Sequence, residues 1–84
     1  MEENKKTKFY LDAIKESLSQ LLGIEKTDIQ TEDSFKEDLH MGPAEITDFI
    51  QLMSKKGINI DNFDTEEIET VGDFVDFLMA NEEI

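Results

Sequence analysis

Apolar residues recur at spacings of three and four in three separate stretches of this chain, and no other feature constrains its fold as strongly. Such spacing places side chains on one face of an α-helix, whereas a half-buried strand requires strict alternation. The stretches cover residues 8–22, 43–56 and 71–78. Their apolar faces consist of Leu11, Ile14, Leu18, Leu21 and Leu22, then Ile46, Phe49, Ile50, Leu52 and Met53, then Val71, Phe74, Phe77 and Leu78. The pattern predicts an all-α fold, with Phe74 and Phe77 in the core.

The residues that flank these stretches are typical of helix ends. Gly23 follows the first stretch, as expected where a helix ends in a left-handed residue, and Gly57 ends the second. Pro43 suits the first position of a helix, because its missing N–H would lack an intrahelical partner there anyway. Thr70 and Asp73 form a capping pair for the last helix. These signals support three main helices.

The connection over residues 24–42 has no sustained periodicity and is longer than most loops in compact domains. We therefore expect it to be either disordered or pinned to the core, and the residues suited to pin it are Ile24, Ile29, Phe35 and Leu39. Ser34 and Glu37 can form a capping box for one short turn. A short third helix is expected over 64–69. The fold prediction is thus a small four-helix bundle in a single domain over residues 1–84, with a long loop between helices one and two.

Charge and size limit the classes of function open to the chain. Its 21 acidic and 8 basic residues give a net charge of -13. This charge repels nucleic acids and anionic membranes and favours a protein partner with a basic patch. The absence of cysteine excludes disulfides, thiolate zinc sites and cysteine nucleophiles. Residues 1–8 are polar, with no apolar run behind them that suits a signal peptide or a membrane span. We expect a soluble, cytoplasmic monomer.

Neither catalysis nor metal binding is indicated by the side chains available. No cluster of residues meets the geometric roles of an active site, so we predict that the protein is not an enzyme. His40 is the only histidine and has no nucleophile or ligand partner in the pattern, so it is assigned no role. The acidic stretch 61–67 resembles a calcium loop, but glycine is absent at its sixth position and Phe63 occupies a ligand position. We expect no dedicated metal site, only loose binding of divalent cations.

Three segments of the chain carry a resemblance to a known family. They are Leu22-Gly23-Ile24, Ser34-Phe35-Lys36-Glu37-Asp38-Leu39 and Ile68-Glu69-Thr70-Val71-Gly72-Asp73. Their order and spacing are similar to those of the acyl carrier protein family over nearly the whole chain. The resemblance implies an up-and-down helical bundle whose small interior, in the family, receives an acyl chain. It also implies a role in fatty-acid, polyketide or related synthesis.

In that family the loop ends in Asp-Leu-Gly-Ala-Asp-Ser-Leu, and the serine at the start of helix two receives 4′-phosphopantetheine from coenzyme A. The corresponding stretch here is Asp38-Leu39-His40-Met41-Gly42-Pro43-Ala44-Glu45-Ile46. Counting forward from Leu39 puts Pro43 at the serine position, and counting back from Ile46 through a one-residue deletion puts Gly42 there. Neither residue carries a nucleophile. The resemblance therefore implies a degenerate attachment position at Gly42 and Pro43, and no cofactor is expected.

Other hydroxyl groups keep a second interpretation open. The nearest is that of Thr47, about one turn inside the predicted helix and outside its terminal array of N–H groups. Ser17, Ser19 and Ser54 lie farther away in the pattern. The alternative is thus a functional acyl or aminoacyl carrier that bears 4′-phosphopantetheine at an unusual residue. An engineered or decaying copy would also lack the serine, although the apolar periodicities are intact on both sides of the altered site.

The resemblance also implies a docking surface. In the family, partner enzymes with basic patches recognise acidic residues on helix two and in the loop before it, and Glu37, Asp38, Glu45 and Asp48 match those positions. Met41 and Pro43 would lie at the apex of the same surface, unless Met41 packs into the bundle. The acids could instead form a solvated face that complements the helix dipole. The leading prediction is an interaction domain that docks on a basic surface, such as that of a synthase or an acyltransferase.

Overall fold

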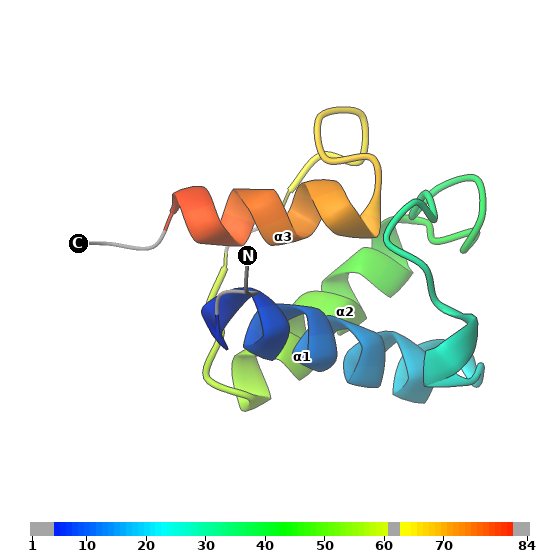
Figure 1. Cartoon of the computed structure of the whole chain (residues 1–84). Coiled ribbons are helices and arrows are strands. Elements are labelled where there is room, and N and C mark those ends of the chain that lie inside the picture. Colours follow the sequence, from blue (N-terminus) through cyan, green and yellow to red (C-terminus); the bar gives the residue numbers. More distant parts are fainter. Residues whose placement is uncertain (1–4, 61–62, 82–84) are drawn as a thin grey trace.

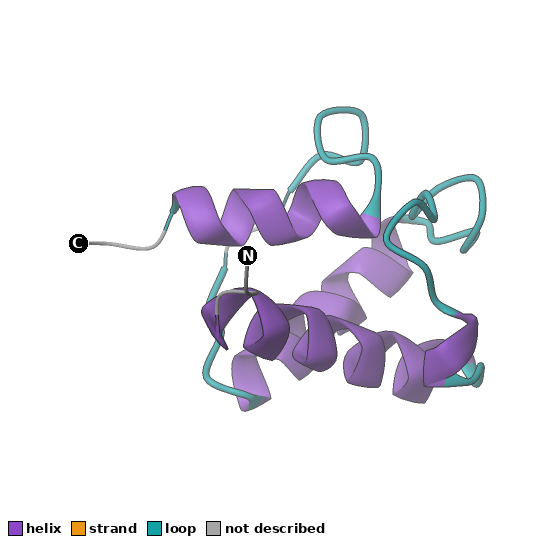
Figure 2. Cartoon of the chain, viewed as in Figure 1, coloured by secondary structure: helices purple, strands orange, loops and turns teal. Residues whose placement is uncertain are grey.

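The computed structural model describes residues 5–60 and 63–81, which form three α-helices joined by two long connections (Figures 1 and 2). Helix α1 spans Lys5–Leu22, α2 spans Pro43–Lys55 and α3 spans Val71–Ala80. A 3₁₀ helix, η1, spans Lys26–Asp28 in the first connection. The predicted all-α class is confirmed, and the arrangement is consistent with the bundle that the resemblance implies.

The helix ends follow the sequence signals, because each rests on local backbone chemistry. Gly23 and Gly57 adopt left-handed φ values of 72° and 88°. Pro43 is the first residue of α2. At the start of α3, the Asp73 N–H donates to Thr70 Oγ1 at 3.0 Å and the Thr70 N–H donates to Asp73 Oδ2 at 3.3 Å. This reciprocal pair is the predicted cap of the last helix.

The segment 64–69 forms a turn and not the short third helix that we predicted. The Ile68 N–H donates to the Asp64 carbonyl at 2.8 Å, which closes one turn. Thr70 is already extended, with φ -117° and ψ 167°, so that it can cap α3. It also pairs with Ser34 in an isolated antiparallel bridge. Because the chain must be extended here, a helix cannot continue beyond Ile68.

The long first connection is pinned to the core, which confirms the second of the two alternatives predicted for it. Ile29 and Phe35 are buried, with 1% and 0% of their surface exposed, while Ile24 and Leu39 are partly buried against the core. Backbone hydrogen bonds tie the connection to the start of α3: the Val71 N–H donates to the Asp33 carbonyl at 3.0 Å. The connection therefore has a defined path across the bundle.

The turn that begins at Ser34 is closed differently from the predicted capping box. The Glu37 N–H donates to Ser34 Oγ at 3.0 Å, as predicted. The second hydrogen bond of the turn involves Asp38 and not Glu37. The Ser34 N–H donates to Asp38 Oδ2 at 2.7 Å. The shorter aspartate side chain one position later takes the role assigned to Glu37, whose carboxylate is left exposed.

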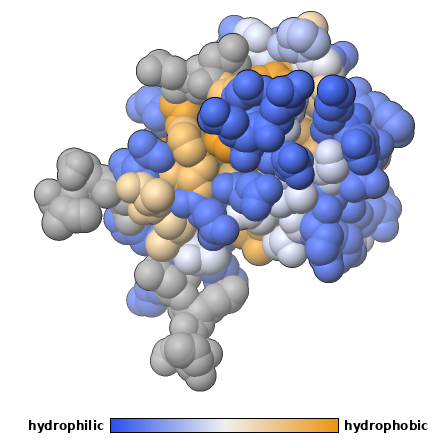
Figure 3. All heavy atoms as spheres, turned by 90° about the horizontal axis from the view of Figure 1, so that it is seen from above, coloured by the Kyte–Doolittle hydropathy of each residue, from blue (hydrophilic) through white to orange (hydrophobic). Residues whose placement is uncertain are grey.

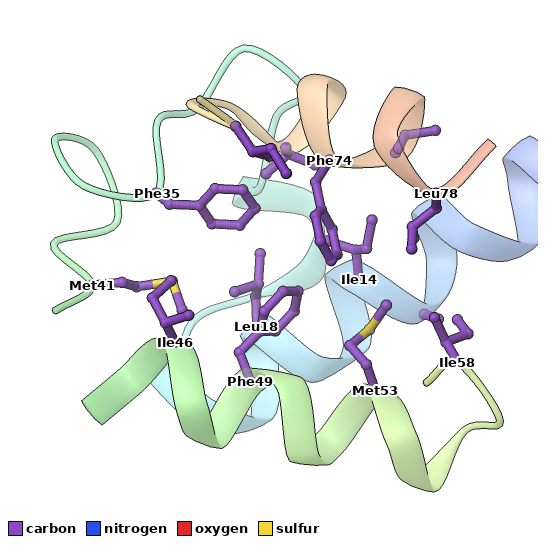
Figure 4. Close-up of a cluster of buried hydrophobic side chains, with 14 of the residues drawn as sticks. Ile14, Leu18, Phe35, Met41, Ile46, Phe49, Met53, Ile58, Phe74 and Leu78 are labelled. Atoms are coloured by element: carbon purple, nitrogen blue, oxygen red, sulfur yellow. The ribbon is translucent and has the colours of Figure 1, made fainter. Parts of the chain in front are cut away.

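The core lies where α1 packs against both other α-helices, and the space between α2 and α3 is filled by side chains (Figure 4). Phe35, Phe49, Phe63 and Phe74 bring their rings together, and the closest pair, Phe63 and Phe74, has centroids 4.8 Å apart. Phe74 is fully buried, whereas Phe77 is only partly buried. A small aromatic centre thus holds together helices and loops that come from distant parts of the sequence.

Candidate functional site

The start of α2 is where the family resemblance would place an attached group. Gly42 is the N-cap, with an extended backbone, and Pro43 follows as the first helical residue. The Gly42 N–H donates to Glu45 Oε1 at 2.9 Å. Glycine has no side-chain oxygen to return a bond, so only one half of a capping box forms. The helix start is well made, but neither of its first two residues carries a nucleophile.

This helix start is also a poor receptor for an anion. Helix N-termini attract phosphates through N–H groups that lack intrahelical partners. Here the Gly42 N–H is bound by Glu45, and Pro43 has no N–H. The Glu45 carboxylate also places its own negative charge at the positive end of the helix. An added phosphodiester would meet fewer donors and an existing carboxylate.

The hydroxyl groups named in the sequence lie elsewhere and are bonded within the protein. Thr47 is exposed, and its Oγ1 donates to the Pro43 carbonyl at 3.0 Å. Ser54 Oγ bonds Asn59 Oδ1 at 2.9 Å, near the other end of α2. In α1, the buried Ser17 lies 3.6 Å from Met53 Sδ, and Ser19 Oγ donates to the Ile24 carbonyl at 2.6 Å. Of these four, only Thr47 lies near the start of α2.

The predicted docking acids differ in how freely their charges are presented. Glu37 and Asp48 are exposed, and no hydrogen bond or ion pair within the described residues engages either carboxylate. Asp38 is exposed, but one of its oxygens holds the turn at Ser34. Glu45 is half-buried and caps α2. Asp38 and Glu45 thus have structural roles of their own.

Met41 does not form an exposed contact at the apex of this surface, which corrects that part of the prediction. Only 4% of its surface is exposed, and its side chain lies beside Ile46 in the core (Figure 4). His40, with a left-handed φ of 55°, turns the chain just before it. The Met41 N–H then donates to the Phe35 carbonyl at 2.9 Å. The turn at His40 and this hydrogen bond direct the Met41 side chain inward, where its apolar surface is removed from water.

A groove of about 820 Å³ opens beside the start of α2, and the sequence pattern did not reveal it. Its apolar lining consists of Met41, Ile46, Phe63, Ile68 and Phe77, and its polar lining includes Lys36, Thr47, Asp64, Thr65 and Glu67. Gly42 and Pro43 complete its wall, and none of these residues belongs to α1. Seen from above, apolar surface interrupts a largely hydrophilic face (Figure 3). Residues from both connections meet here, which periodicity within single helices could not show.

Residues 5–60 and 63–81 contain neither a metal-binding cluster nor a helix suited to span a membrane. No group of three or more histidine or carboxylate side chains in this part of the chain is placed to hold a metal ion. None of its helices combines the length and the hydropathy that crossing a membrane requires. The groove and the acids around the start of α2 are the features that lie where the resemblance would place a functional site.

Comparison with known proteins supports the resemblance seen in the motifs. The chain is 28% identical over 72 residues to acyl carrier proteins from Chlamydia trachomatis serovars L2, D and A, with 84% of this chain and 94% of each relative covered. The chain is distantly similar to acyl carrier proteins. Those relatives are carrier proteins and not enzymes. No protein-family model matches the chain.

Proposed function

We propose that this protein is an acyl-carrier-protein-like interaction domain that does not carry 4′-phosphopantetheine. The observation that carries the proposal is the start of α2, where Gly42 and Pro43 stand without a hydroxyl. Attachment of phosphopantetheine requires a side-chain oxygen that attacks phosphorus. The bond from the Gly42 N–H to Glu45 supports the same conclusion, because it removes a donor that a phosphodiester would use.

The proposed role is docking on a basic surface of a synthase or an acyltransferase in fatty-acid, polyketide or related metabolism, in the cytoplasm. The net charge of -13 would steer such a partner toward the protein over long range. Glu37 and Asp48 supply free carboxylates near the start of α2, and Asp38 adds a third charge. Met41 is left out of this surface because it is buried.

Measurement of the intact mass tests whether the protein can carry 4′-phosphopantetheine. Wild-type protein is incubated with coenzyme A and a phosphopantetheinyl transferase, with an acyl carrier protein from Chlamydia trachomatis as the positive control. We expect the control to gain the mass of phosphopantetheine and this protein to remain unchanged. Gly42→Ser and Pro43→Ser variants, treated in parallel, test whether a hydroxyl at either position is sufficient to restore modification.

A mass gain on the wild-type chain would contradict the proposal and support the alternative of a carrier modified at an unusual residue. Thr47 is the residue to check first, because its hydroxyl is exposed and lines the groove. If the gain disappears in Thr47→Ala but persists in Ser54→Ala, the attachment is at Thr47. The mass of the protein isolated from its own organism answers the same question without an added enzyme.

Docking is tested separately by recovering partners from the host at low and high salt. We expect a salt-sensitive partner whose affinity falls roughly three- to tenfold when Glu37→Gln and Asp48→Asn are combined. The matched control combines Glu25→Gln with Asp76→Asn, which removes the same charge from exposed positions elsewhere. An equal loss in both variants would show only a net-charge effect, and absence of any salt-sensitive partner would count against docking.

A further inference from the structure

The first two turns of α1 present an exposed apolar side chain between lysines. Phe9 is 52% exposed and is the one large apolar side chain classed as exposed in the described part of the chain. With Lys5, Lys8, Leu11 and Asp12 it lines a shallow hollow of about 540 Å³. Asp12, the one carboxylate there, lies 3.8 Å from Lys26. The surface is therefore apolar at its centre and basic around it, on a molecule that is strongly acidic overall.

The lysines of this hollow are not engaged by carboxylates of the protein. Lys5 and Lys8 are exposed and form no ion pair within the described residues. Phe9 contacts Tyr10, with ring centroids 5.7 Å apart, but half of its surface stays in water. A basic, aromatic patch of this kind is suited to an acidic, apolar partner.

The same molecule carries a surface with the complementary properties. The groove beside α2 has an apolar lining that includes Phe63, Ile68 and Phe77. Its lining carries two exposed carboxylates, those of Asp64 and Glu67, and one cation, Lys36, so acidic groups predominate. It contains no residue of α1, whereas every residue of the basic hollow belongs to α1. The two surfaces share no lining residue, so one molecule can offer its patch while its groove receives another.

We propose that the Phe9 patch of one molecule docks in the groove of a second copy, with Lys5 and Lys8 facing Asp64 and Glu67. The contact is heterologous, because different surfaces meet, so it leaves a free patch and a free groove at the two ends of the pair. Association therefore continues beyond a dimer. A symmetric contact between two patches would instead bring lysines against lysines.

The net charge limits this association without preventing it. At an ionic strength of 0.15 M the Debye length is about 8 Å, so charges on opposite sides of two small molecules are largely screened, while charges in direct contact are not. The principal extents of the protein are 32 × 26 × 24 Å, several times that length. The sequence favours a monomer on charge alone, and we expect monomers at low protein concentration and assembly only as concentration rises.

Sedimentation velocity over a wide concentration range, at an ionic strength near 0.15 M, tests the proposal. For the wild type we expect the average mass to rise with concentration past that of a dimer. Phe9→Ser should weaken association at least tenfold, and Phe9→Leu should retain most of it. Thr47→Arg combined with Glu67→Lys places cations in the groove and should have the same effect as Phe9→Ser, whereas Asp76→Lys, an exposed change elsewhere, should not.

Mixing the Phe9→Ser variant with the groove variant tests the proposed contact most directly. Phe9→Ser retains an intact groove, and the groove variant retains an intact patch, so the mixture should form heterodimers and nothing larger. Lys5→Glu with Lys8→Glu reverses the charge of the patch without removing Phe9 and should also weaken association. Its charge-matched control is Lys15→Glu with Lys55→Glu, which should still associate.

A wild type that stays monomeric throughout, a dimer that does not grow, or a mixture without heterodimers would overturn the proposal. The mass test of the proposed function does not involve Phe9 or the lysines around it. Either conclusion can therefore fail without the other.

Discussion

At the scale of single residues, His40 determines how the loop enters the start of α2. It is the one non-glycine residue with a positive φ in the described part of the chain, and it follows Asp38 and Leu39, where the family motif has glycine. The left-handed conformation costs an ordinary residue about 1–2 kcal/mol, because its Cβ crowds the following carbonyl. The turn that results directs Met41 into the core.

Replacing this histidine by glycine should therefore stabilise the protein. We expect His40→Gly to raise the free energy of unfolding by up to about 1 kcal/mol, because the relief of backbone strain exceeds the extra freedom of glycine in the unfolded chain. Chemical denaturation measures the change. Glu37→Gly, in the preceding turn without a positive φ, should lower stability instead, and a loss of stability in both variants would contradict the strain at His40.

At the scale of elements, an ion-pair cluster links α1 to the end of α2. Lys56, which caps α2, places its Nζ 2.7 Å from Glu16 Oε1, and Lys26 of η1 lies 3.7 Å from Glu16 Oε2. The hydrogen bond and charge of Lys56, followed by the charge of Lys26, lower the pKa of Glu16 below its ordinary value of 4.5. One carboxylate thus connects three helical elements.

This arrangement predicts the sign of a pH effect. A lowered pKa in the folded state means that the contribution of Glu16 is complete above pH 4.5 and is lost as pH falls through the folded-state pKa. Wild type should therefore be more stable than Glu16→Gln at neutral pH, and the difference should shrink in acid and in high salt. Urea denaturation at neutral and acidic pH measures it, with Glu25→Gln as the control. A difference that is constant with pH would contradict the ion pairs as its source.

At the scale of the whole molecule, self-repulsion is the dominant electrostatic condition. A net charge of -13 is held within a radius of gyration of 11.9 Å, and eight basic residues are spread over the chain. Folding concentrates these acids, so the compact state has more to gain from counterions than the unfolded chain. The acidic residues are spread along the whole chain, so the effect should be diffuse.

Magnesium or calcium should accordingly raise the melting temperature. We expect a rise larger than that given by sodium chloride at matched ionic strength, because divalent ions gather more strongly around clustered carboxylates. The rise should be gradual with concentration and should not saturate at one ion per protein. Thermal unfolding followed by circular dichroism measures it. Equal rises in sodium chloride and in magnesium chloride would show that screening alone is responsible.

The local features of the fold were predictable from the residues, and the features that join distant segments were not. The α-helices, the left-handed glycines and the Thr70–Asp73 cap each depend on residues within a few positions of one another. Burial of Ile29 and Phe35 was one of two alternatives that the sequence left open for their loop, and the structure decided between them. The helix predicted over 64–69 was wrong, because pairing between Ser34 and Thr70 lies outside any local pattern.

The sequence alone determined that this protein is helical and acidic and that α2 begins without a hydroxyl, because periodicity, charge and residue identity need no coordinates. The tertiary structure decided that Met41 is buried, that the groove exists and that Phe9 is left exposed. Each of these depends on which segments of the chain meet. A side chain's exposure is set by neighbours that are distant in sequence, and only the folded chain brings them together.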